Sequence, residues 1–329
     1  MYYYLKEEQI EAFYQAICDH DTIIIHRHER PDPDALGSQN GLKALIEAAF
    51  PEKKILLAGT DMKSLAWLGK MDKVHQEVYK DALVIVCDTA NRERIDGKYF
   101  GHGAYLIKID HHLLVDSYGD PEIACPQAGS TSEILTLMSQ YLGDRLPMTK
   151  AAAYLLYAGI LGDTGRFLFA TSPATFQAAA FLAEFDLPLR EISDHFQVMS
   201  LEEVRFQGYA YQQVQVDQAS GVAYLDINQE TIKEYGISED QTHSVVNLPS
   251  QIQGIYAWVS FIEQEGDNPK WRVRLRSKGP AINTIAEHFQ GGGHAMASGA
   301  KLNQASEKAQ VLEELKTAVA SYLEDQAKL

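Results

Sequence analysis

Four short apolar segments, separated by segments of helical character, constrain the fold of this chain more than any other feature of its sequence. Each is apolar along almost its whole length, which is typical of strands buried on both faces of a parallel sheet. The helical segments supply the covering layers. We therefore predict an α/β N-terminal region built on a mostly parallel sheet. The predicted strands are 22–26, 54–59, 83–88 and 105–110, and the predicted helices are 7–19, 35–50, 130–142, 148–161 and 173–185.

Acidic and imidazole side chains follow three of these strands, at the points where the strands are expected to end. Ligands of parallel sheets collect outside the carboxyl ends of the strands, so these side chains are expected to meet in space. A further Asp follows a helix that is apolar nearly all round, where a buried carboxylate needs a partner. This set of oxygen and imidazole ligands suits divalent transition ions such as Mn²⁺. The candidate ligands are His28, Asp32, Asp34, Asp88, His111 and Asp163.

Each of these residues also has a simpler interpretation. Asp-Pro-Asp at residues 32–34 is common turn chemistry, and an Asp there could cap the following helix. Asp88 could cap a turn, and Asp163 could pair with Arg166. His112 is expected either to support a metal ligand or to contact a substrate phosphate. The coincidence of acids and imidazoles at one edge of the sheet favours the metal site.

A second, smaller α/β region begins near residue 212. At 271–278, arginine and lysine alternate with apolar residues or serine, so a strand there would carry four cations on one face. Like charges stacked in this way repel one another unless they meet anions, and guanidinium groups suit phosphate geometry. The alternative is a solvated outer face, which we expect for Arg272. The cations are Arg272, Arg274, Arg276 and Lys278.

A glycine-rich segment follows at residues 290–299. Three consecutive glycines allow positive φ and close backbone approach, so their N–H groups could form a nest for an anion. His294 comes directly after them and could donate a hydrogen bond to a phosphate oxygen. A flexible turn is the alternative for the glycines alone, and the nearby arginine-rich strand favours phosphate binding.

These patterns divide the chain into three parts. We predict a catalytic domain at 1–186, a linker with helical parts at 187–211, and a smaller substrate-binding α/β domain at 212–329, across a cleft from the first. Besides 271–278, the predicted strands of the smaller domain are 222–227 and 255–263, and its predicted helices are 229–235, 282–289 and 306–326.

The composition narrows the class of protein. A formal net charge of −16 makes the chain a poor candidate for tracking long nucleic acid. Its cysteines, Cys18, Cys87 and Cys125, are scattered, which favours a reducing compartment over a disulfide frame. Residues 1–13 lack the pattern of a signal peptide, and no apolar run is long enough to span a bilayer. We expect a cytoplasmic protein that does not bind membranes.

Five motifs, in order along nearly the whole chain, resemble those of the DHH phosphoesterase family with its DHH-associated C-terminal domain. They are HRHERPDPDALGS, VCDTAN, IDHH, GILGDTGRF and GGGHAMASG. The resemblance is to the nano-RNase and pAp-phosphatase branch, which also contains stand-alone cyclic-di-AMP and pApA phosphodiesterases.

The resemblance implies a centre of two Mn²⁺ ions, with Mg²⁺ and Co²⁺ left open as substitutes. One ion would be held by His28, Asp32 and Asp88. The other would be held by Asp34, Asp88, His111 and Asp163, so that Asp88 bridges the two. The residues that match the family's substrate-binding motifs are Arg276, Ser277, Gly292, Gly293 and His294. Arg276 and Ser277 are adjacent, so in a regular strand only one of them would face the substrate unless a bulge re-aims the other.

By this resemblance the chain is a phosphoric ester hydrolase that uses two-metal hydroxide attack, with Asp88, His111 and His112 at the reacting phosphate. The expected substrates are pApA, short oligoribonucleotides and pAp, with cyclic-di-AMP left open, and the products are 5′-mononucleotides. A manganese inorganic pyrophosphatase also resembles the N-terminal half, but the GGGH motif opposes that alternative. The complete ligand set opposes a non-catalytic nucleotide-binding module. The sequence leaves the oligomeric state open, a homodimer included.

Overall fold

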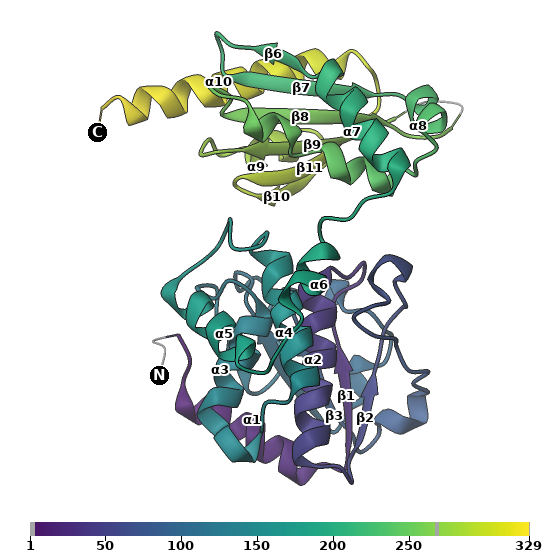
Figure 1. Cartoon of the computed structure of the whole chain (residues 1–329), viewed down its shortest axis with the longest axis vertical. Coiled ribbons are helices and arrows are strands. Elements are labelled where there is room, and N and C mark those ends of the chain that lie inside the picture. Colours follow the sequence, from purple (N-terminus) through teal and green to yellow (C-terminus); the bar gives the residue numbers. More distant parts are fainter. Residues whose placement is uncertain (1–3, 267–269, 329) are drawn as a thin grey trace. The chain divides into compact units, whose positions relative to one another are not determined.

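The computed structural model describes residues 4–266 and 270–328, and the chain divides into two compact units between Val198 and Met199. Each unit is built on its own sheet (Figure 1). The division falls inside residues 187–211, the segment predicted as a linker. Within the described ranges, no helix combines the length and the apolar character needed to cross a membrane.

The N-terminal unit contains a five-stranded sheet in the order β2-β1-β3-β4-β5, and every neighbouring pair is parallel. The predicted mostly parallel α/β fold is therefore confirmed. The last strand, β5, escapes the sequence pattern because its three residues are too few to show a period. The strands are β1 (Thr22–His26), β2 (Lys54–Leu57), β3 (Leu83–Cys87), β4 (Tyr105–Asp110) and β5 (Glu122–Ala124).

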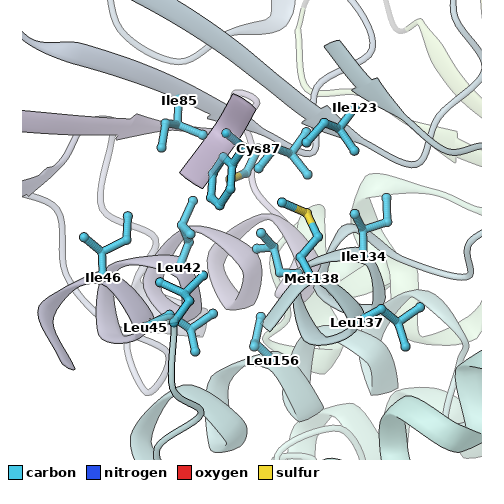
Figure 2. Packing of buried hydrophobic residues seen from close by; sticks show 14 of the residues in the cluster. Leu42, Leu45, Ile46, Ile85, Cys87, Ile123, Ile134, Leu137, Met138 and Leu156 are labelled. Carbon is cyan, nitrogen blue, oxygen red and sulfur yellow. The ribbon is translucent and has the colours of Figure 1, made fainter. Parts of the chain in front are cut away.

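Apolar side chains on one face of this sheet pack against helices. Figure 2 shows Ile85 and Cys87 of β3 together with Leu42 of α2 and Met138 of α3 in one buried cluster. The opposite face packs against residues 74–79 and 95–100, which include short 3₁₀ turns, and against Tyr118. The helices of the unit are α1 (Glu7–Asp19), α2 (Pro33–Ala49), α3 (Thr131–Leu142), α4 (Lys150–Asp163), α5 (Pro173–Ala183) and α6 (Leu189–Asp194). The 3₁₀ turns are η1 (Lys63–Leu65), η2 (Gln76–Tyr79), η3 (Arg92–Arg94), η4 (Phe100–His102) and η5 (Gly143–Arg145).

Helices α2 and α4 run antiparallel in close contact, and glycines make this contact possible. A Cβ atom on Gly37 would lie 2.6 Å from the carbonyl oxygen of Leu155. A Cβ atom on Gly162 would lie 2.8 Å from the Pro33 ring. The start of α2 therefore lies beside the end of α4, which places Asp34 and Asp163 at the same end of the helix pair.

The C-terminal unit contains a six-stranded mixed sheet in the order β10-β11-β9-β8-β7-β6, in which only the β7–β8 pair is parallel. The strands are β6 (Gln215–Asp217), β7 (Val222–Ile227), β8 (Ala257–Glu263), β9 (Trp271–Ser277), β10 (Gly292–His294) and β11 (Ala297–Leu302). The helices are α7 (Leu201–Gln213), α8 (Gln229–Tyr235), α9 (Asn283–His288) and α10 (Glu307–Gln326), and the 3₁₀ turns are η6 (Asp240–Val245) and η7 (Leu248–Gln251).

The glycine-rich segment differs from its sequence-based prediction. Residues 292–294 form the edge strand β10, which pairs with β11, where an open loop is expected from three consecutive glycines. A Cβ atom on Gly293 would lie 2.7 Å from the Ala297 carbonyl oxygen, and Gly293 has a φ of 140°. Glycine is therefore required at this position for the close pairing of the two strands.

Candidate metal centre

His28 lies in the loop that follows β1 and is 3% exposed. Its Nδ1 lies 2.8 Å from the Glu29 carbonyl oxygen, which can only accept, so Nδ1 carries the proton. Its Nε2 lies 3.5 Å from Asp32 Oδ2 and 3.4 Å from Asp88 Oδ2. Asp32 also caps α2, because its Oδ1 accepts a hydrogen bond from the Ala35 N–H. The cap interpretation and the ligand interpretation of Asp32 are thus compatible.

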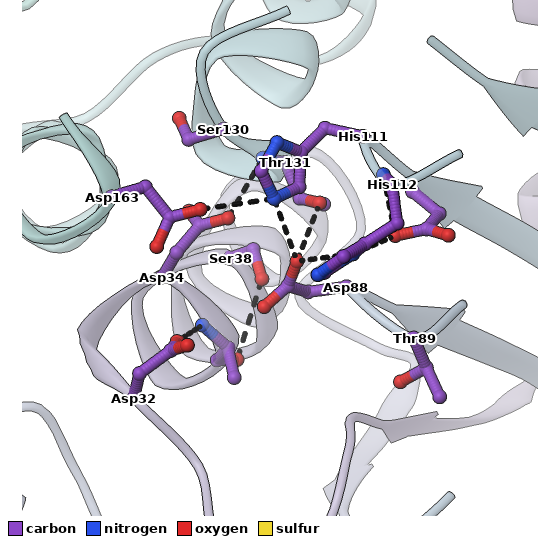
Figure 3. Close-up of polar contacts among 12 residues, drawn as sticks. Asp32, Asp34, Ser38, Asp88, Thr89, His111, His112, Ser130, Thr131 and Asp163 are labelled. Atoms are coloured by element: carbon purple, nitrogen blue, oxygen red, sulfur yellow. Dashed lines mark hydrogen bonds and ion pairs between the residues drawn. The ribbon is translucent and has the colours of Figure 1, made fainter. Parts of the chain in front are cut away.

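Asp88 lies at the end of β3 and is 1% exposed. Its φ of 52° is left-handed, a conformation that Asp tolerates better than most residues. Its Oδ1 accepts a hydrogen bond from Thr131 Oγ1 and lies 3.4 Å from His111 Nε2 (Figure 3). Its Oδ2 accepts no hydrogen bond from any described residue. Apart from the ion-pair contact with His28 Nε2 at 3.4 Å, this buried oxygen lacks a partner among the described residues, which is unfavourable unless a cation binds it.

Asp34 is fully buried at the start of α2. Its two carboxylate oxygens accept hydrogen bonds from the first N–H groups of α3, those of Thr131 at 2.7 Å and Ser132 at 3.0 Å. A helix N-terminus is a favourable place for a carboxylate. Asp163, at the end of α4, lies 2.9 Å from His111 Nε2, and no ion pair joins it to Arg166 in the described part of the chain.

The six candidate ligands therefore meet in two groups that share Asp88. Within each group, the ligand atoms all lie within 4.8 Å of one another. One group is His28, Asp32 and Asp88, and the other is Asp34, Asp88, His111 and Asp163. A third group of the same kind is Asp88, His111 and His112.

Burial and mutual repulsion make the carboxylates of the cluster hard to ionise together, and added positive charge would favour their ionised forms. Burial, and then the neighbouring charges of Asp88 and Asp163, raise the pKa of Asp34 well above its ordinary value. Burial raises the pKa of Asp163 to about 6, although the hydrogen bond with His111 opposes this shift. Burial would lower the pKa of His28, but contacts with Asp32 and Asp88 outweigh it and raise the pKa to about 10. Oxygen and imidazole donors without thiolate suit Mn²⁺, Mg²⁺ or Co²⁺, so these residues fit a pair of such ions.

His112 is held by Asp110, and Asp110 in turn by Lys108, which sequence reasoning did not single out. Its Nδ1 lies 2.8 Å from Asp110 Oδ1, and Asp110 is fully buried. Lys108 is also fully buried, with its Nζ 3.5 Å from Asp110 Oδ2 and hydrogen bonded to two carbonyl oxygens. Burial opposes ionisation of Asp110, but His112 and Lys108 lower its pKa. The sequence signal for Lys108 is a lone cation inside an otherwise apolar strand.

Arg27, which the sequence pattern does not indicate, and Thr131, one of the hydroxyl residues at 130–132, also support the centre. The Arg27 side chain is fully buried, ion paired with Asp96, and donates to the carbonyl oxygen of His28 at 2.9 Å. Of the hydroxyl residues at the start of α3, Ser130 is the cap, and Thr131 contacts Asp88. The run Gly-Ser-Thr-Ser-Glu predicts a cap and spare hydroxyls, but which hydroxyl reaches the cluster depends on how α3 packs.

In the C-terminal unit, β9 presents three arginines on one face while Val273 and Leu275 are buried on the other. The arginine face borders a cavity of about 430 Å³. The residues that line this cavity include Arg272, Arg274, Arg276, Gln290, Gly291 and Lys301. Burial, and then the charges of Arg272 and Arg276, lower the pKa of Arg274 to about 10. A cavity in which neighbouring cations lower the pKa of Arg274 is suited to an anion.

The remaining predicted substrate-binding residues lie around this strand. The pairing of β9 with β8 and β11 is continuous, so Arg276 and Ser277 face opposite ways. The Ser277 hydroxyl donates to the Pro280 carbonyl oxygen at 2.6 Å. Lys278 follows the end of β9, so only three of the four predicted cations share the strand face. Gly292, Gly293 and His294 form β10, which is separated from β9 by the strand β11.

Comparisons with known proteins cover both units. Residues 22–160 match the DHH family, N-terminal domain, and residues 217–323 match the DHHA1 domain. The bifunctional oligoribonuclease and PAP phosphatase NrnA of Bacillus subtilis is 43% identical, over 91% of this chain and 95% of that protein. The probable bifunctional oligoribonuclease and PAP phosphatase NrnA of Streptococcus mutans is 42% identical, over 90% of this chain and 94% of that protein.

Solved structures share the fold. An exopolyphosphatase-related protein from Bacteroides fragilis has a TM-score of 0.86 at 23% identity, and 98% of each chain is covered. RecJ from Thermus thermophilus, in complex with Mn²⁺, has a TM-score of 0.53 at 14% identity, over 96% of this chain and 54% of that one.

Proposed function

Because the chain belongs to the DHH family, we propose that it is an oligoribonuclease and pAp phosphatase, which releases 5′-mononucleotides from short nucleotides. The reaction class is phosphoric ester hydrolysis. The observation that carries the proposal is the pair of ligand groups that share Asp88, whose Oδ2 lacks a hydrogen-bond donor among the described residues. The relatives match this chain over more than nine tenths of their own length, so both units correspond.

Two divalent cations bound at the shared Asp88 would supply an activated water and neutralise charge on the phosphoryl group. We propose that His28, Asp32 and Asp88 hold one of them, and that Asp34, Asp88, His111 and Asp163 hold the other. Mn²⁺ is the proposed metal, because the mixed imidazole and carboxylate set suits it and a structural relative is in complex with it.

The protein's own groups would orient and stabilise the reacting phosphate. His112, whose ring Asp110 fixes from the Nδ1 side, is proposed to donate to an equatorial phosphate oxygen. Thr131 and Ser132 hold the Asp34 carboxylate through backbone N–H groups, which fixes its orientation without using a side chain. Precise positioning of this kind accounts for much of the acceleration of phosphoryl transfer.

The C-terminal unit is proposed to bind the 5′ nucleotide of the substrate. Arg274 and Arg276 offer planar donor groups to a terminal phosphate in the cavity beside β9. Gly292, Gly293, His294 and Ser277 are proposed to contribute further contacts.

The test is a substrate panel with the purified chain, first treated with EDTA and then supplied with MnCl₂, MgCl₂ or CoCl₂. The substrates are pAp, pApA, cyclic-di-AMP, pyrophosphate and RNAs of about 3, 5 and 24 nucleotides. We expect AMP from pAp and pApA and stepwise release of mononucleotides from the short RNAs, all dependent on added metal. Rapid pyrophosphate turnover with inert pApA, or full activity in EDTA, would refute the proposal.

A further inference from the structure

Arg94 lies at the edge of the metal centre but is not one of its ligands. It ends the 3₁₀ turn η3, and its carbonyl oxygen accepts a hydrogen bond of 2.7 Å from the Glu29 N–H. The next residue, Ile95, forms an antiparallel bridge with His28. The backbone of Arg94 is therefore fixed to the loop that carries His28, while its side chain is exposed.

The guanidinium of Arg94 approaches the far side of the His28 ring. Its Nη2 lies 3.4 Å from His28 Nδ1, whereas His28 Nε2 faces Asp32 and Asp88. Because Nδ1 already donates to the Glu29 carbonyl oxygen, it cannot accept a hydrogen bond from Arg94. The contact is thus between two donors, and it does not explain the placement of the guanidinium.

Neighbouring arginines have acidic partners that Arg94 lacks. Arg92, in the same 3₁₀ turn, is paired with Asp116, and Arg27 is paired with Asp96. Among the described residues, no carboxylate lies within ion-pair distance of Arg94. In a chain with a formal net charge of −16, a cation without an acidic partner beside a cluster of carboxylates is available for an anion from outside the protein.

We propose that Arg94 binds the phosphate that follows the scissile one on its 3′ side, in substrates of three or more nucleotides. This inference rests on the proposed function. One imidazole ring separates the guanidinium from the ligand atoms of His28, so Arg94 is placed for a neighbouring phosphate rather than the reacting one. The 5′ phosphate has its own cations in Arg274 and Arg276. The planar fork of donors suits a phosphodiester, and Arg94 thereby favours oligonucleotides over pAp and pApA.

The experiment compares wild type, Arg94→Met and Arg94→Lys on pAp, pApA and pApApA with Mn²⁺. Loss of one charge-assisted phosphate contact is expected to lower kcat/KM for pApApA by about 10- to 100-fold, chiefly through KM. The fall for pAp is expected to be at least about ten times smaller. Arg94→Lys keeps the charge without the fork and should lie in between. Arg190→Met, at an arginine whose side chain is 95% exposed, is the matched control and should match wild type on every substrate.

Salt dependence provides a second measurement that a structural role would not change. Each phosphate contact on a single strand contributes about 0.7 to the slope of log affinity against log salt concentration. Arg94→Met should lower the slope for pApApA by about this amount and leave the slope for pAp unchanged. A thermal melt of each variant checks that it is folded.

An equal fall on all three substrates would overturn the inference, because Arg94 would then act through His28. A fall on pApA that disappears when its 5′ phosphate is removed would also overturn it, because the contact would be on the 5′ side. Failure of the wild type on the whole panel would refute the proposed function instead.

Discussion

The two units concentrate charge of opposite sign in different ways. In the N-terminal unit, carboxylates and imidazoles come from the ends of parallel strands and from the end of α4, so residues far apart in the chain meet at one edge of the sheet. In the C-terminal unit, Arg272, Arg274 and Arg276 come from alternate positions of one strand. In the proposed function, each arrangement receives a ligand of the opposite charge, divalent cations in the first and a phosphate in the second.

The pKa values of two histidines, one in each unit, are shifted in opposite directions. His28, among the carboxylates, has its pKa raised to about 10, even though burial alone would lower it. His243, beside β9, keeps part of its surface in water, but its partial burial and then the charges of Arg274 and Arg276 lower its pKa to about 4. At His28 the neighbouring carboxylates outweigh burial and raise the pKa, whereas at His243 burial and the neighbouring arginines lower the pKa together.

The largest effect is expected from the carboxylate that the two ligand groups share. Asp88→Asn keeps the shape of the side chain but removes the charge that faces His28 and His111. We expect kcat to fall by about a thousand-fold or more with Mn²⁺ on every substrate, because both ion positions are affected. Steady-state kinetics on pAp and pApA measure the fall in kcat.

The matched control for Asp88→Asn is Asp186→Asn. Asp186 is 99% exposed, and its side chain is paired only with the exposed Lys150 among the described residues. The Asp186→Asn variant should keep the wild-type kcat and KM. If Asp88→Asn retained more than about a tenth of the wild-type rate, Asp88 would not be the shared ligand.

Sequence alone anticipates the acidic edge well, because strand ends have a fixed place in a parallel sheet. Once 22–26, 83–88 and 105–110 are predicted as strands, His28, Asp88 and His111 must lie at the same edge. The start of α2 and the end of α4 lie at one end of this antiparallel pair, and they bring Asp34 and Asp163 to the same place.

What sequence does not provide is the support behind these ligands. Asp110 lies two residues from Lys108 on the same strand, but Asp96, the partner of the buried Arg27, can be identified only after the loops are placed. The edge strand at 292–294 is also missed, since its two glycines have low strand propensity, and only pairing with β11 makes the segment extended.

A smaller effect, of a different kind, is expected in the C-terminal unit. Arg276→Met removes one cation from the cavity beside β9 and is expected to raise KM for pApA by about 10- to 100-fold while kcat changes less. The contrast with Asp88→Asn separates holding the substrate from reacting with it. Lys233→Met, at a lysine whose side chain is 69% exposed, is the control and should leave KM unchanged. A fall confined to kcat would place Arg276 at the reacting phosphate instead.

The smallest effect is the pH dependence of the metal-free protein, which should differ between the units. Because the folded-state pKa of His28 is raised to about 10, its stabilisation is complete below pH 6.5 and is lost as the pH rises toward 10. Because the pKa of His243 is lowered to about 4, stability in its unit falls as the pH decreases from 6.5 toward 4.

NMR titration of the histidine ring carbons should show His28 still protonated at a pH of about 8 and His243 already neutral at about 6. His243 keeps part of its surface in water, so added salt should move its pKa back toward 6.5 more readily than that of His28. Titration of both histidines near 6.5 would show that the two clusters do not impose opposite fields.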